Sequence, residues 1–230
     1  MVEVWAPFAT RFDGPSDKHG YPGQPEPLPK VGLLMHSMEG SMSSALRELA
    51  NAARRASWTF SNPKTGPLLE HYALGSHTWA NGSKEANVKF DSCENEGKAG
   101  EPLTSSQVDN AVELVVWEYQ QNEWTGLERH VQLWEHNEMT RFGAAPTACP
   151  SNRIPWDEII SRAEVILHEE DEEMKLVREQ SSGFVFVMSG VWYSYLRRIE
   201  HATAMGVSPD IEVVPDGTLA SYARADKWWA

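Results

Sequence analysis

Two short apolar segments of this chain each end in a histidine, and this feature limits the possible folds more than any other. Residues 31–36 read VGLLMH, and residues 130–136 read HVQLWEH. Each run has the length of a buried strand, and its histidine lies where the strand gives way to a loop. The sequence therefore predicts two strands of one sheet, with His36 and His136 at their ends.

The chain between these strands alternates helical and extended patterns. Residues 41–56 carry apolar side chains at helical spacing, and Thr104 and Gln107 form a Thr-x-x-Gln capping box that starts a helix over 104–121. Other segments predict a β-hairpin over 57–75, a polar loop over 77–88 and a strand over 89–97. This order predicts an α/β fold, in which a central mixed sheet is flanked by helices.

Composition divides the chain into three regions. Residues 1–30 are rich in Pro and Gly and predict an ordered arm, and residues 31–165 hold the main domain, which a helix over 156–163 closes. An acidic run, HEEDEEMK, precedes a small α+β region over 170–230. That region predicts a hairpin in SSGFVFVMSGVWYSYL with a Ser-Gly turn, and a short helix over Arg198–Met205. Wall targeting and packing against the main domain both stay open as its role.

Charge and hydropathy exclude several classes of partner. The 230-residue chain has a net charge of −13, whereas nucleic-acid binding needs a basic face. A teichoic-acid or lipid surface would not attract this charge either, although a local basic patch around Arg47, Arg54 and Arg55 is compatible with it. The sequence has no apolar run of about 18 residues that could insert in a membrane. Its N-terminus lacks the basic and apolar pattern of a secretory signal.

The chain has two cysteines, Cys93 and Cys149, which are too few for a disulfide framework. Cys149 lies in the loop that follows His136. Two imidazoles and one thiolate can hold a catalytic zinc ion and leave its fourth position for water. Spacing alone does not separate such a site from an unrelated set of two histidines and a cysteine. Cys93 is interpreted as a core thiol.

The segments around these residues resemble a known family. They are LLMHSMEGS, SWTFSNPKTGPLLEHYALGSHTWANG, ANVKFDSCENEG, EPLTSSQ, and the pair LWEHNEM and PTACPSNRIPW. In this order they are similar to the zinc-dependent N-acetylmuramoyl-L-alanine amidases of the phage endolysin and peptidoglycan-recognition type, also called amidase type 2. The resemblance covers roughly residues 30–160, and the arm resembles that of endolysins from phages of actinobacteria.

The resemblance implies a role for individual residues. His36, His136 and Cys149 are the expected zinc ligands. Glu94 is expected beside the water that the zinc activates, or else is a solvated carboxylate at a strand end. Thr147 is expected to stabilise an oxyanion, or else only holds its loop. The family's Trp-His-Ala-Gly loop corresponds to Trp79-Ala80-Asn81-Gly82. The expected substrate-binding residues are Trp79, Asn81, Asn87 and His77, the last replacing the missing histidine.

The resemblance also implies a function. The expected reaction is zinc-dependent hydrolysis of the amide between the lactyl group of muramic acid and L-alanine in cell-wall peptidoglycan. The protein is expected in the host cytoplasm until lysis. Trp58 stands where the family often has a catalytic tyrosine, and Tyr72 is the nearest alternative. Two other functions stay open: a non-catalytic peptidoglycan-binding module, and a cysteine peptidase that uses Cys149 or Cys93 with a histidine. The oligomeric state is not predicted.

Overall fold

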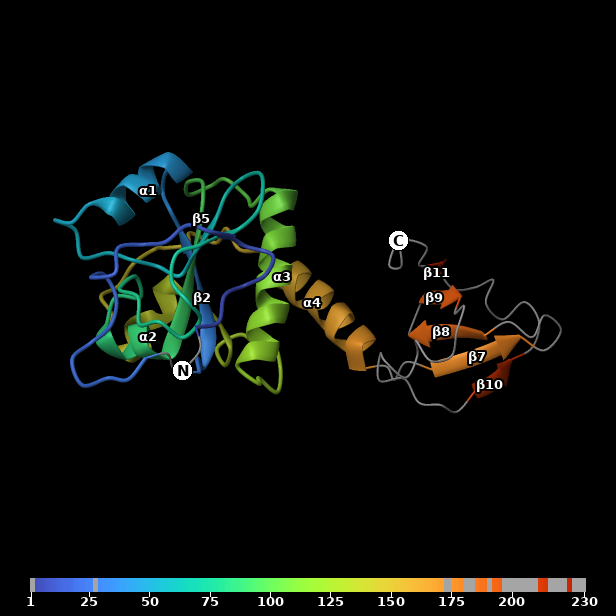
Figure 1. Cartoon of the computed structure of the whole chain (residues 1–230). Coiled ribbons are helices and arrows are strands. Elements are labelled where there is room, and N and C mark those ends of the chain that lie inside the picture. The colour runs from blue at the N-terminus through green and yellow to red at the C-terminus, as the bar shows by residue number, and fades with distance from the viewer. Residues whose placement is uncertain are drawn as a thin grey trace. The chain divides into compact units, whose positions relative to one another are not determined.

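The chain forms two compact units, Met1–Ala163 and Glu164–Ala230. The computed structural model (Figure 1) describes residues 3–26, 29–171, 175–179, 185–189, 192–195, 211–214 and 223–224. Each unit is considered by itself, because the position of one relative to the other is not determined. Among the described residues, no helix has the length and apolar character needed to cross a membrane.

A six-stranded mixed sheet forms the centre of the first unit. Its strands lie in the order β1-β4-β3-β5-β2-β6, with the bounds β1 Thr10–Arg11, β2 Gly32–Ser37, β3 Phe60–Asn62, β4 Leu69–Glu70, β5 Phe90–Asn95 and β6 Leu133–Glu135. The β3–β4 pair is antiparallel and the other neighbours are parallel. The predicted α/β fold with a mixed sheet and the hairpin over 57–75 are therefore confirmed.

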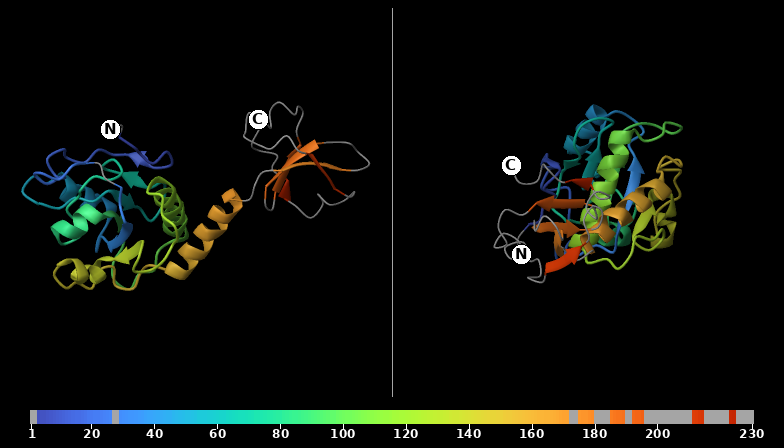
Figure 2. Two further views of the ribbon diagram at one scale, coloured as in Figure 1. Left: turned by 90° about the horizontal axis from the view of Figure 1, so that it is seen from below. Right: turned by 90° about the vertical axis from the view of Figure 1, so that its right-hand side faces the viewer.

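Helices cover both faces of this sheet. They are α1 Met42–Ala50, α2 Lys84–Lys89, α3 Ser105–Gln121, the 3-10 helix η1 His136–Phe142 and α4 Trp156–Asp171. Helix α3 lies on one side of the sheet and α2 on the opposite side (Figures 1 and 2). The predicted capping box is confirmed, because Thr104 accepts from the backbone of Gln107 and Gln107 accepts from that of Thr104.

Two local predictions were wrong. Helix α1 ends at Ala50 instead of continuing to residue 56, because the Asn51 side chain accepts the backbone N–H of Ala53 and turns the chain. The segment predicted as a polar loop contains helix α2. Ser83 caps this helix by accepting the N–H of Ala86, and Ala86 then packs in a core cluster with Leu34 and Phe90.

The arm over residues 3–26 packs along the edge of the sheet. Strand β1 pairs in parallel with β4, so the arm adds the outermost strand. Farther along, the backbone N–H of Gly20 donates to the carbonyl of His77 at 3.0 Å. The arm therefore contacts both the hairpin edge and the loop that precedes α2.

Three parallel strands carry the predicted site residues to one edge. His36 near the end of β2 lies in register with Glu94 near the end of β5, and Met35 lies in register with Glu135 at the end of β6. His136 follows directly as the first residue of η1. Because the carboxyl ends of parallel strands share one edge, these residues meet there, where open α/β sheets commonly bind ligands.

The second unit contains a separate five-stranded sheet in the order β10-β7-β8-β9-β11. The bounds are β7 Lys175–Glu179, β8 Val185–Ser189, β9 Trp192–Tyr195, β10 Ile211–Val214 and β11 Ala223–Arg224. Strands β8 and β9 pair antiparallel, as the predicted hairpin requires. The glycine of its Ser-Gly turn and the predicted helix over Arg198–Met205 lie outside the described residues.

Candidate metal centre

Three side chains that can bind a metal ion converge at the carboxyl ends of the strands in the first sheet. One ligand atom each from His36, His136 and Cys149 lies within 4.8 Å of the others. The Nδ1 atom of His36 lies 3.9 Å from the sulfur of Cys149, and the centroids of the two imidazole rings are 4.4 Å apart. The end of β2, the start of η1 and the following loop therefore supply one cluster.

The spacing of this cluster fits a small tetrahedral metal ion. Zinc binds imidazole nitrogen at about 2.0–2.1 Å and thiolate sulfur at about 2.3 Å, so two ligands of one zinc lie about 3.4–3.8 Å apart. The separation of 3.9 Å between His36 Nδ1 and Cys149 sulfur needs only a small adjustment to reach this range. Two histidines and a cysteine also leave a coordination position for water.

Hydrogen bonds fix which nitrogen of His36 faces the cluster. The Nδ2 amide of Asn81 donates to the carbonyls of Phe90 at 3.0 Å and Ala86 at 3.3 Å, so its Oδ1 atom is an acceptor. This Oδ1 lies 3.1 Å from His36 Nε2, which must therefore carry the proton. The lone pair of His36 Nδ1 is then free and points toward Cys149.

The environment keeps both histidines neutral. Burial lowers the pKa of His36 well below its ordinary value, and the nearby His136 lowers it further. Burial also lowers the pKa of His136. A neutral imidazole has the lone pair that a metal ligand needs, so both side chains are ready to bind without losing a proton first.

Cys149 is held by contacts that the sequence did not reveal. The backbone N–H of Ser37 donates to its sulfur at 3.2 Å, and the backbone N–H of Asn137 donates to its carbonyl at 2.7 Å. The buried guanidinium of Arg153 donates to the Ser37 hydroxyl at 2.8 Å and to the carbonyl of Glu96 at 2.8 Å. Arg153 therefore joins the cysteine loop to the ends of β2 and β5.

Glu94 and Thr147 lie beside the cluster. A carboxylate oxygen of Glu94 lies 3.7 Å from His36 Nδ1. Burial raises the pKa of Glu94 to about 8, and the negative charge of Glu39 adds to this effect. The other Glu94 oxygen has no hydrogen-bond partner among the described residues. The Thr147 hydroxyl accepts the backbone N–H of Cys149 at 3.2 Å, so it contacts the loop that holds the cysteine.

A groove of about 550 Å³ opens over the cluster, and we call it the metal groove. Helix α1 forms one wall, and Trp58 and Trp79 contribute aromatic surface. The Tyr72 hydroxyl instead donates to the carbonyl of Pro15 at 3.1 Å, and it does not line this groove. The lining residues are His36, Ser37, Met38, Ser44, Ala45, Glu48, Arg54, Ala56, Trp58, Trp79, Ala80, Glu94, His136, Thr147 and Cys149.

The four expected substrate-binding residues occupy different positions. Trp79 lines the metal groove, whereas Asn87 lines a neighbouring cavity. Asn81 and His77 are both completely buried and line neither cavity. Asn81 instead holds His36, and the Nδ1 atom of His77 lies 3.7 Å from a carboxylate oxygen of Glu26 in the arm. The loop thus contributes one partly exposed aromatic side chain and several buried polar ones.

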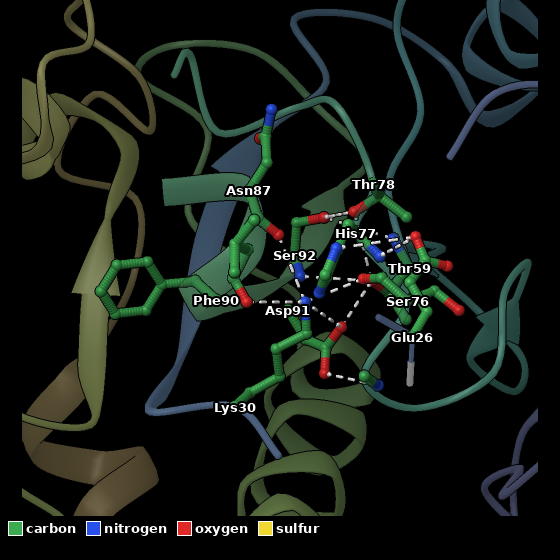
Figure 3. A network of polar contacts seen from close by, with 12 residues as sticks. Glu26, Lys30, Thr59, Ser76, His77, Thr78, Asn87, Phe90, Asp91 and Ser92 are labelled. Carbon is green, nitrogen blue, oxygen red and sulfur yellow. Dashed lines mark hydrogen bonds and ion pairs between the residues drawn. The ribbon is translucent and has the colours of Figure 1, made fainter. Parts of the chain in front are cut away.

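A buried polar network holds the segment over residues 76–87 in place (Figure 3). The Lys30 ammonium donates to the carbonyls of Ser76 at 2.8 Å and Asn87 at 3.2 Å, and it lies 4.0 Å from Asp91. Asp91 accepts the Thr59 hydroxyl at 3.0 Å. A buried charge with so many partners keeps its segments in place, because breaking such a pair is strongly unfavourable.

Cys93 does not take part in the cluster. It is completely buried on β5, and burial raises the pKa of its thiol well above the ordinary value. Successive residues of a strand point to opposite faces, so Cys93 and its neighbour Glu94 face opposite sides of the sheet.

Comparisons with known proteins establish the fold. No family model matches the sequence, and no curated protein is significantly similar to it. Solved structures do match: the hydrolase AmiA of Staphylococcus aureus in complex with its ligand has a TM-score of 0.55 at 13% identity, covering 71% of this chain and 86% of that one. A mutant endolysin from Bacillus subtilis has a TM-score of 0.52 at 15% identity, covering 67% and 97%.

The third match is the N-acetylmuramoyl-L-alanine amidase LysC from Clostridium intestinale. Its TM-score is 0.50 at 14% identity, covering 69% of this chain and 99% of that one. With sequence identities this low, these structural matches establish a shared fold alone. They leave the chemistry to be argued from the residues of this chain.

Proposed function

We propose that this chain is a zinc-dependent N-acetylmuramoyl-L-alanine amidase of the endolysin type. Its reaction is hydrolysis of the amide between the lactyl group of muramic acid and L-alanine in peptidoglycan. The observation that carries the proposal is that His36, His136 and Cys149 lie together at the carboxyl ends of the strands. Likeness of fold to proteins described as an amidase and an endolysin supports the choice of bond.

The cluster residues would hold the metal, and Glu94 would handle protons. When bound, zinc supplies Lewis acidity, which lowers the pKa of water and polarises a carbonyl. Glu94 lies close enough to the cluster for its carboxylate form to accept a proton from the attacking water and to return it to the leaving amine. The unpartnered oxygen of Glu94 leaves one site available for that exchange.

Thr147 and the two tryptophans would orient the substrate. Thr147 lines the metal groove and offers a hydroxyl donor that can stabilise a developing oxyanion, an effect worth about 3 kcal/mol for one well-placed donor. Trp58 and Trp79 supply apolar faces, and Glu48 and Arg54, which also line the groove, supply charges of both signs. This mixture suits a glycopeptide, which has sugar rings, amides and carboxylates.

Analysis of the cleavage products tests the proposed reaction. Purified peptidoglycan digested by the zinc-loaded chain should yield new L-alanine amino groups and no new reducing sugar ends. New reducing ends would show a glycosidase and would contradict the proposal. Glu94→Gln should lower the rate at least 100-fold, because it removes the proton acceptor, while its zinc content stays unchanged.

A non-catalytic peptidoglycan-binding module is the main alternative. Such a module needs a groove but neither a complete set of metal ligands nor a proton acceptor. The presence of Cys149 as a third donor, with Glu94 alongside, favours catalysis. Binding of peptidoglycan fragments without any product, by a chain shown to contain zinc, would favour the module instead.

A cysteine peptidase is less compatible with the electrostatics. A nucleophilic thiol needs a lowered pKa, usually beside a positive group. Burial instead raises the pKa of Cys149 to about 12, and the charge of Glu94 raises it further. Alkylation with chelator present should therefore be slow, and activity should depend on metal rather than on reducing agent.

A phage origin and a cytoplasmic location before lysis belong to the same proposal, and the family resemblance motivates them. Fractionation of infected cells tests the location. The chain should remain in the cytoplasmic fraction until lysis begins. Its appearance in the medium while the cells are still intact would contradict this part of the proposal.

A further inference from the structure

A second groove adjoins the metal groove, and we call it the arm groove. It encloses about 810 Å³ between the arm and the loop that leads into α2. Trp79 lines both grooves, so the two are neighbours along one surface. The arm groove is lined by His19, Gly20, Tyr21, Pro22, Arg55, Trp79, Gly82, Ser83, Lys84 and Asn87.

The charges of the arm groove differ from those of the whole chain. The chain has 33 acidic and 20 basic residues, yet the groove lining contains Arg55 and Lys84 and no carboxylate. The third basic group, His19, is already paired with Glu26 at 2.8 Å. Across the described residues, neither Arg55 nor Lys84 forms an ion pair or a side-chain hydrogen bond. Two positive charges are therefore available to a ligand.

Each of these cations lies over an aromatic ring. The guanidinium carbon of Arg55 is 5.4 Å from the centroid of the Trp79 ring, and the Lys84 ammonium is 5.4 Å from that of the Tyr21 ring. The groove thus combines two partly exposed aromatic faces with a positive group near each. Aromatic faces pack against the apolar faces of sugar rings, and Arg and Lys bind carboxylate and phosphate.

The groove is built before any ligand arrives. The Trp79 indole donates to the carbonyl of Gly20 at 3.2 Å, and the Asn87 amide donates to the Tyr21 hydroxyl oxygen at 2.6 Å. Asn87 in turn rests on the buried Lys30 and Asp91 network, as Figure 3 shows. Walls that are fixed in advance lose little entropy on binding, which favours a binding site over an accidental hollow.

We propose that the arm groove is a subsite for an anionic saccharide. The sugar ring packs on Trp79 and Tyr21, and its carboxylate or phosphate lies between Arg55 and Lys84. The choice of a saccharide rests on the proposed function. Trp79 lines both grooves, so a peptidoglycan chain bound in the metal groove would extend into the arm groove. The net charge of the chain does not prevent such binding, because the local charges act at much shorter range.

Titration of the full chain with three small sugars tests the subsite. The probes are N-acetylmuramic acid, N-acetylglucosamine 6-phosphate and neutral N-acetylglucosamine, followed by NMR at the backbone amides of Gly20 and Lys84. A chelator is present, so that no metal can hold the carboxylate. At least one charged sugar should bind about tenfold or more tightly than the neutral one, as expected for one charge-assisted hydrogen bond. The tighter of the two identifies the source as the carboxylate of a muramic acid without its stem peptide, or as a wall phosphate.

A charge-matched pair of variants gives the control. Arg55→Ala with Lys84→Ala should abolish the preference for charged sugars, and both side chains are exposed, so folding should persist. Arg47→Ala with Lys98→Ala removes the same charge from exposed positions outside both grooves and should keep the preference. Equal loss in the two pairs would overturn the proposal.

Other outcomes also decide the question. Equal binding of neutral and charged sugars, or tighter binding of adenosine monophosphate than of any sugar, would overturn the saccharide subsite. The titration measures no amide hydrolysis, so it can succeed or fail independently of the proposed reaction. A chain that prefers charged sugars but cleaves no peptidoglycan would retain the subsite and lose the amidase proposal.

Discussion

Asn81 is the residue on which the geometry of His36 depends. Its side chain accepts from one imidazole nitrogen and is oriented by two backbone carbonyls, so the other nitrogen must face Cys149. Histidine ligands of metals usually make such a bond with their second nitrogen, and this bond sets the orientation of the ring. Asn81 is completely buried and lines neither groove, so we propose that it positions His36 rather than contacting the substrate.

Replacing Asn81 should weaken metal binding. We expect Asn81→Ala to lower zinc affinity about 10–100-fold, the usual cost of losing such a partner. Competition with a chromophoric chelator measures this affinity on folded protein, independently of activity. Asn110→Ala is the matched control, because Asn110 also bonds through its amide but contacts Asn62 and Gly66. Unchanged zinc affinity in Asn81→Ala would refute the positioning role.

At the scale of single residues, the sequence predicted some residues of the candidate site and missed others. His36 and His136 end apolar runs, so a periodic pattern marks them. No sequence pattern identifies Asn81, Ser37 and Arg153, because their roles depend on contacts between segments far apart in the chain. Asn81 and His77 were expected to bind substrate, yet both are completely buried. A loop residue shows its burial only after the fold is known.

The arm contacts one buried acid, Glu70. The Glu70 carboxylate at the end of β4 accepts the backbone N–H of Ala6 at 2.7 Å, and its other oxygen has no hydrogen-bond partner among the described residues. Burial raises the pKa of Glu70 from its ordinary value of 4.5 to about 8. The folded chain therefore holds a proton on Glu70 over a range of pH where the unfolded chain has lost it.

This difference predicts a pH dependence of stability. As pH rises from about 4.5 to about 8, Glu70 should lower the free energy of unfolding by up to about 1.4 kcal/mol per pH unit. Below that window its contribution is constant, because both states are protonated. Glu70→Gln should remove this part of the slope in urea unfolding measured across the window.

A second variant controls for the lost charge. Glu85→Gln removes an exposed carboxylate that pairs with Lys89, so it should leave the slope as in the unaltered chain. Identical slopes for Glu70→Gln and the unaltered chain would show that Glu70 does not hold a proton in the folded state.

The elements themselves were largely predictable. Strands β2 and β6 lie in short apolar runs, and α3 begins with a complete capping box, so local signals mark them. Helix α2 was missed because its six residues are too few to show a helical period. The pairing of β1 with β4 was not predictable, because a two-residue strand in a Pro-rich arm has no pattern of its own.

At the scale of the whole molecule, each unit has a sheet of its own. The strands β1–β6 and β7–β11 form two separate sheets, and no pairing between described residues joins them. Residues 3–163 also contain the cluster of His36, His136 and Cys149 and both grooves. This organisation indicates that the first unit holds the proposed chemistry, and we propose that the region over 170–230 adds affinity for the wall.

Truncation after Asp171, which keeps α4 whole, tests this division. We expect the shortened chain to cleave a soluble muramyl peptide at the rate of the full chain, within about twofold. Sedimentation with intact walls should show at least tenfold weaker binding, as for the loss of one binding module. Loss of solubility or of a cooperative unfolding transition would instead mean that the second unit packs against the first and stabilises it.

The centre formed by His36, His136 and Cys149 is the claim on which the rest depends. Cobalt replaces zinc in such sites and reports its ligands by absorption. Added to metal-free full chain, one equivalent of cobalt should give the visible bands of a tetrahedral ion and a near-ultraviolet thiolate charge-transfer band. Cys149→Ser should lose the charge-transfer band, whereas Cys93→Ser should keep it. A spectrum of octahedral cobalt, or a thiolate band that survives in Cys149→Ser, would contradict the proposed metal centre.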